Sequence, residues 1–148
     1  MADAGDPRLI ETLRRALDFA GLDDEQLARM VTASSLERYG AGQTLFDKGS
    51  EPDGLYVVVS GSVRIFDVMH DQEHDLALIE PGDFTGEVSL ALHTTRTRAA
   101  KAKEDSEILV LPVGSFDELT SEHPALGAQL IEAFEDRAAR REEAAAEE

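Results

Sequence analysis

The sequence predicts a single domain that is mainly β, of sandwich, jelly-roll or barrel type, with helices at both ends. The length of 148 residues suits one domain. Glycines recur between short β-rich runs in the middle of the chain, and helical spacing is confined to the two ends. Within residues 1–148 we expect a helical N-terminal segment over 7–38, a β-barrel over 39–112, C-terminal helices over 115–140 and a frayed acidic tail over 141–148.

Two helices are predicted before the strands. Leu9, Leu13 and Leu17 repeat every four residues, which is typical of one apolar helix face. Asp23 is a candidate N-cap for the second helix, because Gln26 follows it at the spacing of a capping box. Both segments therefore favour helices that pack one face against the strands.

The middle of the chain contains several runs that resemble strands. The clearest runs cover residues 55–59, 63–68, 76–79 and 108–111. Ser60-Gly61 separates the first two runs, so we expect them to form a hairpin. Many short strands at intervals of about ten residues favour antiparallel sheets over a parallel βαβ fold.

Helical signals return after the last strand. Ser115 and Glu118 have the spacing of a capping box, and Pro124 fits the first turn of a further helix. The apolar face of that helix includes Leu130, Ile131 and Phe134. The residues beyond 140 are alanines and charged side chains with nothing large to bury, so we expect this end to fray.

Charge and composition exclude several function classes. The chain has 14 basic and 31 acidic residues, a net charge of −17, which disfavours binding to nucleic acid or to an anionic membrane surface. It has no cysteine, which excludes disulfides, a thiol nucleophile and cysteine-ligated metals. No apolar run reaches the ~18 residues of a membrane span, and the acidic start does not resemble a signal peptide. We therefore expect a soluble cytoplasmic protein.

Residues 81–100 differ from ordinary strand-and-turn sequence. Gly86 precedes a short predicted helix, Glu87–Leu92, whose first backbone N–H groups would suit a phosphate. Arg96 follows ten residues after Gly86 and offers a planar fork that matches two phosphate oxygens. Glu87 would repel a phosphate but can accept a hydrogen bond from a sugar hydroxyl. Together these groups predict a site for a small phosphorylated riboside.

This segment resembles the phosphate-binding cassette of the cyclic nucleotide-binding domain family, which includes cAMP-receptor-type regulators, kinase regulatory subunits and gated channels. The family pattern is Phe-Gly-Glu, an apolar residue, Ala-Leu, a short loop and Arg-x-Ala. The segments 42–45, 53–58 and 60–63 and Gly49 are similar too, and the resemblance covers about residues 10–138. It implies an eight-stranded jelly roll, or double-stranded β-helix, with N-terminal helices and a C-terminal pair of lid helices.

The resemblance also implies a set of ligand contacts. It places Glu87 on the ribose 2′-hydroxyl, Arg96 on the cyclic phosphate and Thr97 beside the phosphate and base, where its hydroxyl could select cGMP. The implied ligand-binding residues are Gly86, Glu87, Val88, Ser89, Arg96, Thr97 and Arg98. The implied lid candidates are Leu130, Ile131 and Phe134, although core packing is the alternative for at least two of them.

The cassette departs from the family pattern at three positions. Thr85 separates Phe84 from Gly86, and Ser89 stands where alanine is common. Arg98 stands where a small residue is expected, and strand alternation would point it to the same side as Arg96. Arg98 could add a phosphate donor, fill the pocket or turn to solvent. Arg98 could also be the arginine of the pattern itself, but we favour Arg96 because the downstream sequence then keeps the usual register.

We therefore expect a non-enzymatic sensor that binds cAMP, with cGMP as the alternative, and that needs no metal. It would signal through its C-terminal helix to an effector protein or a second copy. Lys101 and Lys103, with the two cassette arginines, would offset the acidic background.

Four alternatives stay open. The domain could be a ligand-free interaction module whose pocket is altered by Arg98, or the sensor fragment of a larger regulator or channel. A DNA-binding regulator would require the sequence to be a fragment, since little chain follows the lid helix and the charge is unfavourable. A metal-dependent jelly-roll enzyme would use His70, Asp71, Glu73, His74 and Asp75, for which a polar hairpin loop is the simpler interpretation.

Overall fold

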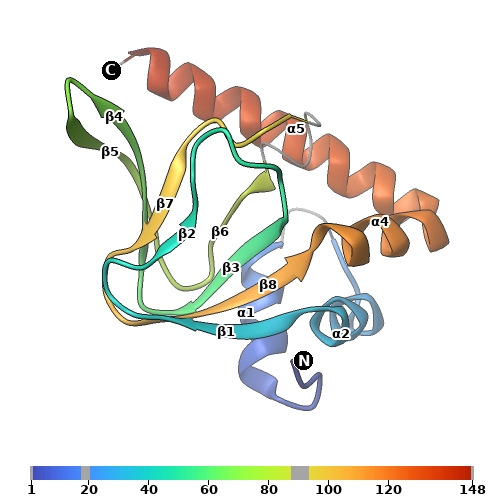
Figure 1. Cartoon of the computed structure of the whole chain (residues 1–148). Coiled ribbons are helices and arrows are strands. Elements are labelled where there is room, and N and C mark those ends of the chain that lie inside the picture. Colours follow the sequence, from blue (N-terminus) through green and yellow to red (C-terminus); the bar gives the residue numbers. More distant parts are fainter. Residues whose placement is uncertain (1, 18–20, 88–93, 148) are drawn as a thin grey trace.

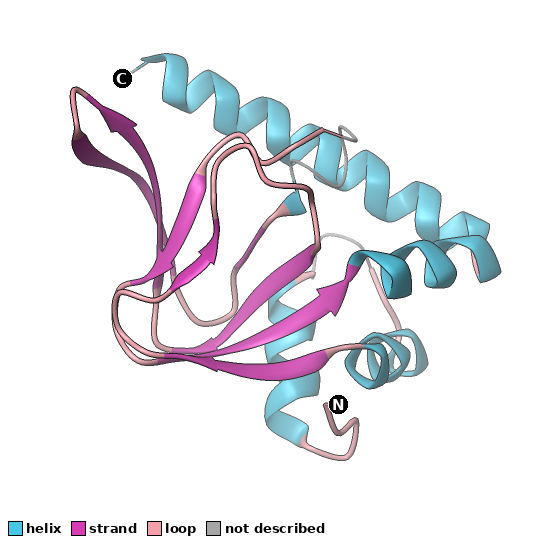
Figure 2. Cartoon of the chain, in the orientation of Figure 1, coloured by secondary structure: helices cyan, strands magenta, loops and turns pink. Residues whose placement is uncertain are grey.

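The computed structural model of the chain describes residues 2–17, 21–87 and 94–147 (Figure 1). It contains two antiparallel four-stranded sheets that face each other as a jelly roll, with helices from both ends of the chain beside them (Figure 2). The predicted eight-stranded fold is therefore confirmed. The strands are β1 (Ser35–Tyr39), β2 (Thr44–Phe46), β3 (Gly54–Ser60), β4 (Val63–Met69), β5 (Gln72–Ile79), β6 (Phe84–Thr85), β7 (Ala99–Ala102) and β8 (Ser106–Pro112).

The strand order separates neighbours in sequence. One sheet has the order β1-β8-β3-β6 and the other has the order β2-β7-β4-β5. The predicted hairpin between β3 and β4 is thus wrong, because the turn at Ser60-Gly61 carries the chain from one sheet to the other. Gly61 has a φ of +84°, and a Cβ there would lie 2.5 Å from Asp105 O. A tight crossing against the β7–β8 turn therefore requires glycine at this position.

The two N-terminal helices form as their capping signals predict. In α1 (Pro7–Ala16) the Asp6 side chain accepts a hydrogen bond from Arg8 N at 2.9 Å. In α2 (Asp24–Ala33) the predicted capping box of Asp23 and Gln26 is confirmed. The helical segment ends earlier than predicted, however, because residues 35–39 are β1 and pair along their length with β8. The pairing with a distant strand, which local sequence does not reveal, decides the conformation here.

The polar segment after β4 is mostly strand rather than loop. Only His70 and Asp71 form the turn, with φ values of 55° and 63°, and β5 begins at Gln72. Glu73 and Asp75 stay at the sheet surface because Arg64 on β4 pairs with both. Cross-strand ion pairs of this kind allow a strongly polar sequence to continue a hairpin.

The C-terminal helices differ from the prediction at both ends. Helix α4 (Val113–Glu122) begins before Ser115, and its N-cap is Pro112 without a side-chain cap, so the capping box of Ser115 and Glu118 is wrong. Helix α5 (Pro124–Glu147) begins at the predicted proline but continues past residue 140. Alanine, glutamate and arginine are strong helix formers, which explains the extension. None of the described helices is both long and apolar enough to cross a membrane.

Strand β3 lies between two hydrophobic clusters. Leu55 and Val57 face a cluster shared with the helices, which includes Leu13 and Phe134. The alternating residues, of which Tyr56 is one, face a second cluster between the two sheets. This alternation is what a central strand requires when both of its faces are buried. The alternation determines which way each side chain at the start of β3 faces, and the candidate site lies beside this end of the strand.

Candidate functional site

Arg96 is a charged side chain of the cassette that is almost completely buried. Only 1% of its side chain is exposed. Its Nη1 donates to Gly86 O at 3.0 Å, and its Nη2 donates to Gly54 O at 2.9 Å and to Asp53 Oδ1 at 2.7 Å. Its Nε has no hydrogen-bond partner among the described residues. The guanidinium is therefore held in one orientation, with its Nε–H still available as a donor.

The backbone around Arg96 explains how the guanidinium reaches this place. Arg96 N donates to Ser50 O at 2.8 Å, and Gly49 N donates to Arg96 O at 2.7 Å. These bonds fasten the segment to the loop between β2 and β3. Arg96 therefore lies beside the start of β3, where Asp53 and Gly54 provide acceptors.

Gly86 brings Arg96 and Glu87 together. It follows β6, has a φ of +96°, and accepts the Arg96 hydrogen bond through its carbonyl oxygen. A Cβ at this position would lie 2.9 Å from Gly54 O and 3.0 Å from Arg96 Nη1. Only glycine combines this conformation with so close an approach. The glycine of the cassette is thus required by both the backbone and the arginine.

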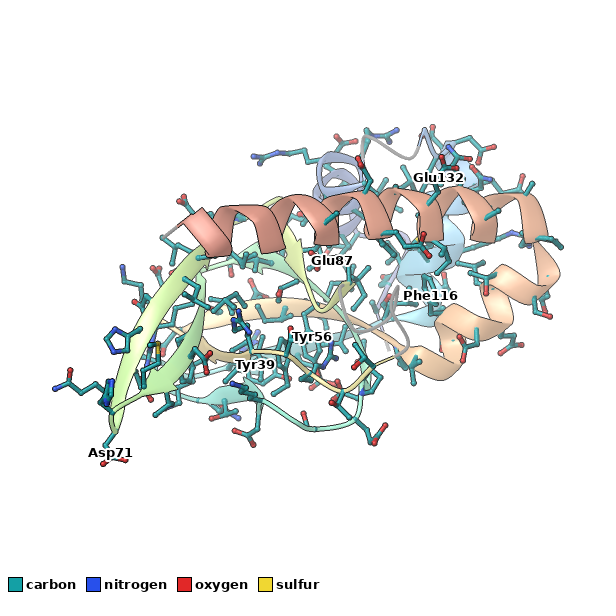
Figure 3. All side chains as sticks on the ribbon, turned by 90° about the horizontal axis from the view of Figure 1, so that it is seen from above. Tyr39, Tyr56, Asp71, Glu87, Phe116 and Glu132 are labelled. Atoms are coloured by element: carbon teal, nitrogen blue, oxygen red, sulfur yellow. The ribbon has the colours of Figure 1, made fainter. Side chains whose placement is uncertain are left out.

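Glu87 is fully buried directly after Gly86. It has helical backbone, as predicted for the start of the short helix, and Figure 3 shows it in the central part of the molecule. Residues 88–92 of the predicted helix, which include the predicted contacts Val88 and Ser89, lie outside the described residues. A buried carboxylate beside Gly86 and a buried guanidinium bonded to Gly86 form the core of the site.

Three neighbours of Arg96 were not among the predicted site residues. Asp53 pairs with Arg96 and also accepts a hydrogen bond from Tyr56 Oη at 2.7 Å. Burial, followed by this hydrogen bond, raises the pKa of Tyr56 well above its ordinary range. The rings of Phe46 and Tyr56 lie 4.3 Å and 5.7 Å from Arg96 Cζ. Asp53 and Tyr56 stand in a segment that resembles the family, whereas nothing in the sequence around Phe46 indicates its role.

Thr97 and Arg98 occupy a bend rather than a strand. Strand β7 begins at Ala99, so the alternation that would place Arg96 and Arg98 on one side does not apply. Both residues are half-buried, and Arg98 Nη1 donates to Thr97 O at 2.8 Å. A hydrogen bond from Lys48 is the main cause that lowers the pKa of Asp67, and the charge of Arg98 adds to it. Arg98 therefore lies on the side of the site toward β4.

The two lysines after the cassette have local roles. Lys101 on β7 pairs with Glu73 at 2.9 Å and lies over the Phe66 ring. Lys103 follows the end of β7, and its backbone N–H donates to Ser62 O at 2.9 Å. A carboxylate of β5 thus already compensates the charge of Lys101.

The three lid candidates lie on α5 and contribute to the core. Leu130 and Phe134 are fully buried, and Ile131 is half-buried against the same cluster. The Phe134 ring lies 5.7 Å from the Phe84 ring and 6.1 Å from the Phe116 ring. Because Phe84 belongs to β6, directly before the cassette glycine, this contact joins α5 to the cassette.

The polar cluster on β5 is remote from these residues. Figure 3 shows Asp71 at the outer end of the β4–β5 hairpin, far from Glu87 and Tyr56 in the middle of the molecule. Within the described part of the chain, no group of three or more histidines and carboxylates is arranged to hold a metal ion. Glu73 and Asp75 are instead paired with cationic side chains.

Comparison with known proteins identifies relatives of very different lengths. The chain is 37% identical over 94 residues to the cyclic AMP receptor protein of Thermus thermophilus, which covers 63% of this chain and 44% of that protein. It is 30% identical over 95 residues to lysophospholipase NTE1 of Cryptococcus neoformans var. neoformans, which covers 64% of this chain and 6% of that protein. The chain thus spans less than half the length of either relative.

Solved structures share most of this fold. The N-terminal domain of a transcriptional regulator from Streptomyces coelicolor A3(2) matches with a TM-score of 0.75 and 33% identity, over 87% of this chain and 93% of that one. The catabolite activator protein of Thermus thermophilus matches with a TM-score of 0.73 and 33% identity, over 84% of this chain and 59% of that one. The sequence model of the protein family described as cyclic nucleotide-binding domain matches residues 36–123, from β1 through the cassette to the end of α4. The chain belongs to the cyclic nucleotide-binding domain family.

Proposed function

We propose that this domain binds a 3′,5′-cyclic nucleotide, cAMP in preference to cGMP, and that it signals through its C-terminal helices. The observation that carries the proposal is the state of Arg96. Its guanidinium is buried and oriented by Gly86, Gly54 and Asp53, yet its Nε–H has no partner among the described residues. A buried donor without a partner costs about 1–3 kcal/mol. The singly charged phosphate of a cyclic nucleotide would supply the missing acceptor.

Glu87 suits a different part of the nucleotide from Arg96. The negative charge of Glu87 disfavours the phosphate but suits a ribose hydroxyl, which donates a hydrogen bond to a carboxylate. Gly86 directly precedes Glu87 and lets the backbone approach Arg96 closely. We therefore assign Arg96 to the phosphate and Glu87 to the ribose.

The preference for cAMP is supported by the relatives. One relative that is 37% identical is named cyclic AMP receptor protein, and the regulatory domain of Toxoplasma gondii PKA, which has the same fold at a TM-score of 0.70, was solved with cAMP. Thr97 is the described cassette residue that would face the base. Its hydroxyl can bond the 2-amino group of guanine, so cGMP is the ligand to compare.

The signal would pass from the cassette to α5. Phe84 belongs to the cassette and contacts Phe134 on α5, so a shift of the cassette changes the packing of that helix. A ligand shifts such an equilibrium only by its different affinity for the two states. We propose that an effector protein or a second copy reads the position of α5, in the cytoplasm, and that the domain itself performs no catalytic step and needs no metal.

Calorimetry with purified protein tests the proposal. We expect saturable heat with cAMP, weaker binding of cGMP, and a loss of at least tenfold in affinity for Arg96→Ala and for Glu87→Ala. A lost hydrogen bond to a charged group corresponds to about 1.5–3 kcal/mol. Arg64→Ala is the matched control, since this arginine pairs with surface carboxylates on another strand. No heat and no rise in melting temperature at millimolar nucleotide would contradict the proposal and favour a ligand-free interaction module.

Arg98→Ala separates the three roles that this residue could have. If Arg98 fills the pocket, the variant gains affinity for the nucleotide. If Arg98 adds a phosphate donor, the variant loses affinity. In the third role, Arg98 turns away from the pocket, and the affinity of the variant stays within about twofold of the wild type. The bond from Arg98 to Thr97 O and the position of Arg98 toward Asp67 support this third role.

A further inference from the structure

The guanidinium of Arg96 lies on an aromatic surface formed by two strands of different sheets. Its Cζ is 4.3 Å from the centroid of Phe46 on β2 and 5.7 Å from that of Tyr56 on β3. The two rings contact each other at 5.5 Å with an interplanar angle of 56°. Phe46 is 9% exposed, so its ring is almost entirely buried against these neighbours.

An irregularity in β2 places the Phe46 ring inside. The pairing of β2 with β7 shifts register between Thr44 and Phe46. Regular alternation would bury only one of the two consecutive residues Leu45 and Phe46. The register shift allows both to be buried while Thr44 stays exposed. The local sequence therefore gives no indication that Phe46 faces Arg96.

The Phe46 ring provides a contact on the face of the Arg96 guanidinium, where this group has no hydrogen bond. Its three hydrogen-bond acceptors hold the guanidinium at its edges, and none of these bonds contacts its face. The only carboxylate in these bonds belongs to Asp53, whose side chain is 61% exposed. An aromatic face attracts a cation above it and packs flat against a guanidinium. Phe46 therefore covers a face of the guanidinium, adds to the hydrogen bonds that orient it, and compensates part of its buried charge.

We propose that Phe46 is a positioning residue for nucleotide binding, which acts by holding the Arg96 guanidinium flat and ready for an anion. The proposal rests on the proposed function, because it concerns how Arg96 presents its remaining donor. It assigns no contact between Phe46 and the nucleotide. It extends the site from the cassette to β2, a strand far from the cassette in the sequence.

Ring removal and ring replacement test the proposal by calorimetry with cAMP. Phe46→Leu keeps an apolar side chain but removes the ring, and we expect its affinity to fall by between about twofold and thirtyfold, the range of a cation–π contact. Phe46→Tyr keeps the ring and should bind within about twofold of the wild type. Phe66→Leu is the matched control, because Phe66 is also buried and packs at 4.5 Å beneath an arginine, Arg64, outside the site. Thermal unfolding of each variant separates lost binding from lost folding.

A double-mutant cycle separates positioning from general packing. Arg96→Lys keeps the charge but has no plane to orient, so adding Phe46→Leu to this variant should change its affinity by less than about twofold. In the wild-type background the same substitution should produce the larger loss given above. If Phe46→Leu lowers affinity equally in the two backgrounds, the cycle is additive and the proposal is overturned.

A nucleotide-independent measurement keeps the two proposals distinguishable. The NMR resonance of the Arg96 Nε–H should carry a ring-current shift that Phe46→Leu reduces, leaving the smaller part due to Tyr56, and that Phe66→Leu preserves. If the wild type binds neither cAMP nor cGMP but shows this shift, the proposed function fails and the positioning of Arg96 stands. If Phe46→Leu leaves the resonance unchanged, the positioning role is refuted whatever the nucleotide affinity.

Discussion

Gly86→Ala is the substitution that tests most directly how the backbone builds this site. Gly86 has a φ of +96°, a conformation in which an alanine is strained by about 1–3 kcal/mol. The new Cβ would lie 2.9 Å from Gly54 O and 3.0 Å from Arg96 Nη1. Gly54 O cannot retreat easily, because Gly54 is paired with Pro112 in the sheet and its oxygen accepts a bond from Arg96.

The magnitude follows from the two costs together. Displacing Arg96 Nη1 removes a hydrogen bond to a charged group, which is worth about 1.5–3 kcal/mol. Added to the backbone strain, this gives an expected destabilisation of about 2.5–6 kcal/mol. The same displacement moves the guanidinium, so affinity for cAMP should fall at least tenfold.

Urea unfolding and calorimetry measure the two effects, with Gly42→Ala as the matched control. Gly42 has a φ of +86° but nothing lies within 4 Å of its Cβ position, so it reports backbone strain alone. We expect Gly42→Ala to cost about 1–3 kcal/mol and to bind cAMP normally. Equal destabilisation by the two substitutions, with unchanged affinity in both, would refute the reasoning.

Three further outcomes are expected. Phe134→Ala should lower the free energy of unfolding by about 3–5 kcal/mol in urea titrations, since the ring is fully buried beside Phe84 and Phe116. The hydrogen bond from Arg8 lowers the pKa of Glu107, so this carboxylate stabilises the fold above its unfolded pKa of about 4.3, and the contribution is lost as the pH falls through the lowered folded pKa. The difference in unfolding free energy between wild type and Glu107→Gln should therefore shrink from about pH 7 to about pH 3. Affinity for cAMP should not fall between about 0.01 and 0.15 M salt, where the Debye length drops from about 30 to 8 Å, and a steep decrease would contradict a site in a repulsive field.

The parts of the site that sequence alone could predict are those built by neighbours in the chain. The capping box of α2 and the pair Gly86 and Glu87 depend on spacings of a few residues. Asp53 and Phe46 reach Arg96 only because the jelly roll brings the starts of β3 and β7 and the end of β2 together. No local pattern contains that information, so these partners became visible only in the structure.

The fold errors have the same physical origin. The turn at Gly61 has the sequence of a hairpin turn, but which sheet the next strand joins depends on pairings with β7 and β8. The bend at residues 97–98 interrupts the strand alternation that would have aligned Arg98 with Arg96. At Gly61 the sequence predicts the turn but not the sheet that the next strand joins, whereas at residues 97–98 it misses the bend itself.

The acidic composition and an anionic ligand are compatible because the two interactions act over different distances. A net charge of −17 repels a polyanion at every phosphate, and this repulsion grows with the number of ligand charges. A cyclic nucleotide carries one charge, so the long-range cost is small and salt screens it. In the proposed site the attraction would come from a guanidinium whose side chain is 1% exposed, where water and salt screen little. If the proposed function holds, burial of a single oriented arginine would allow an acidic domain to select a small anion and disfavour nucleic acid.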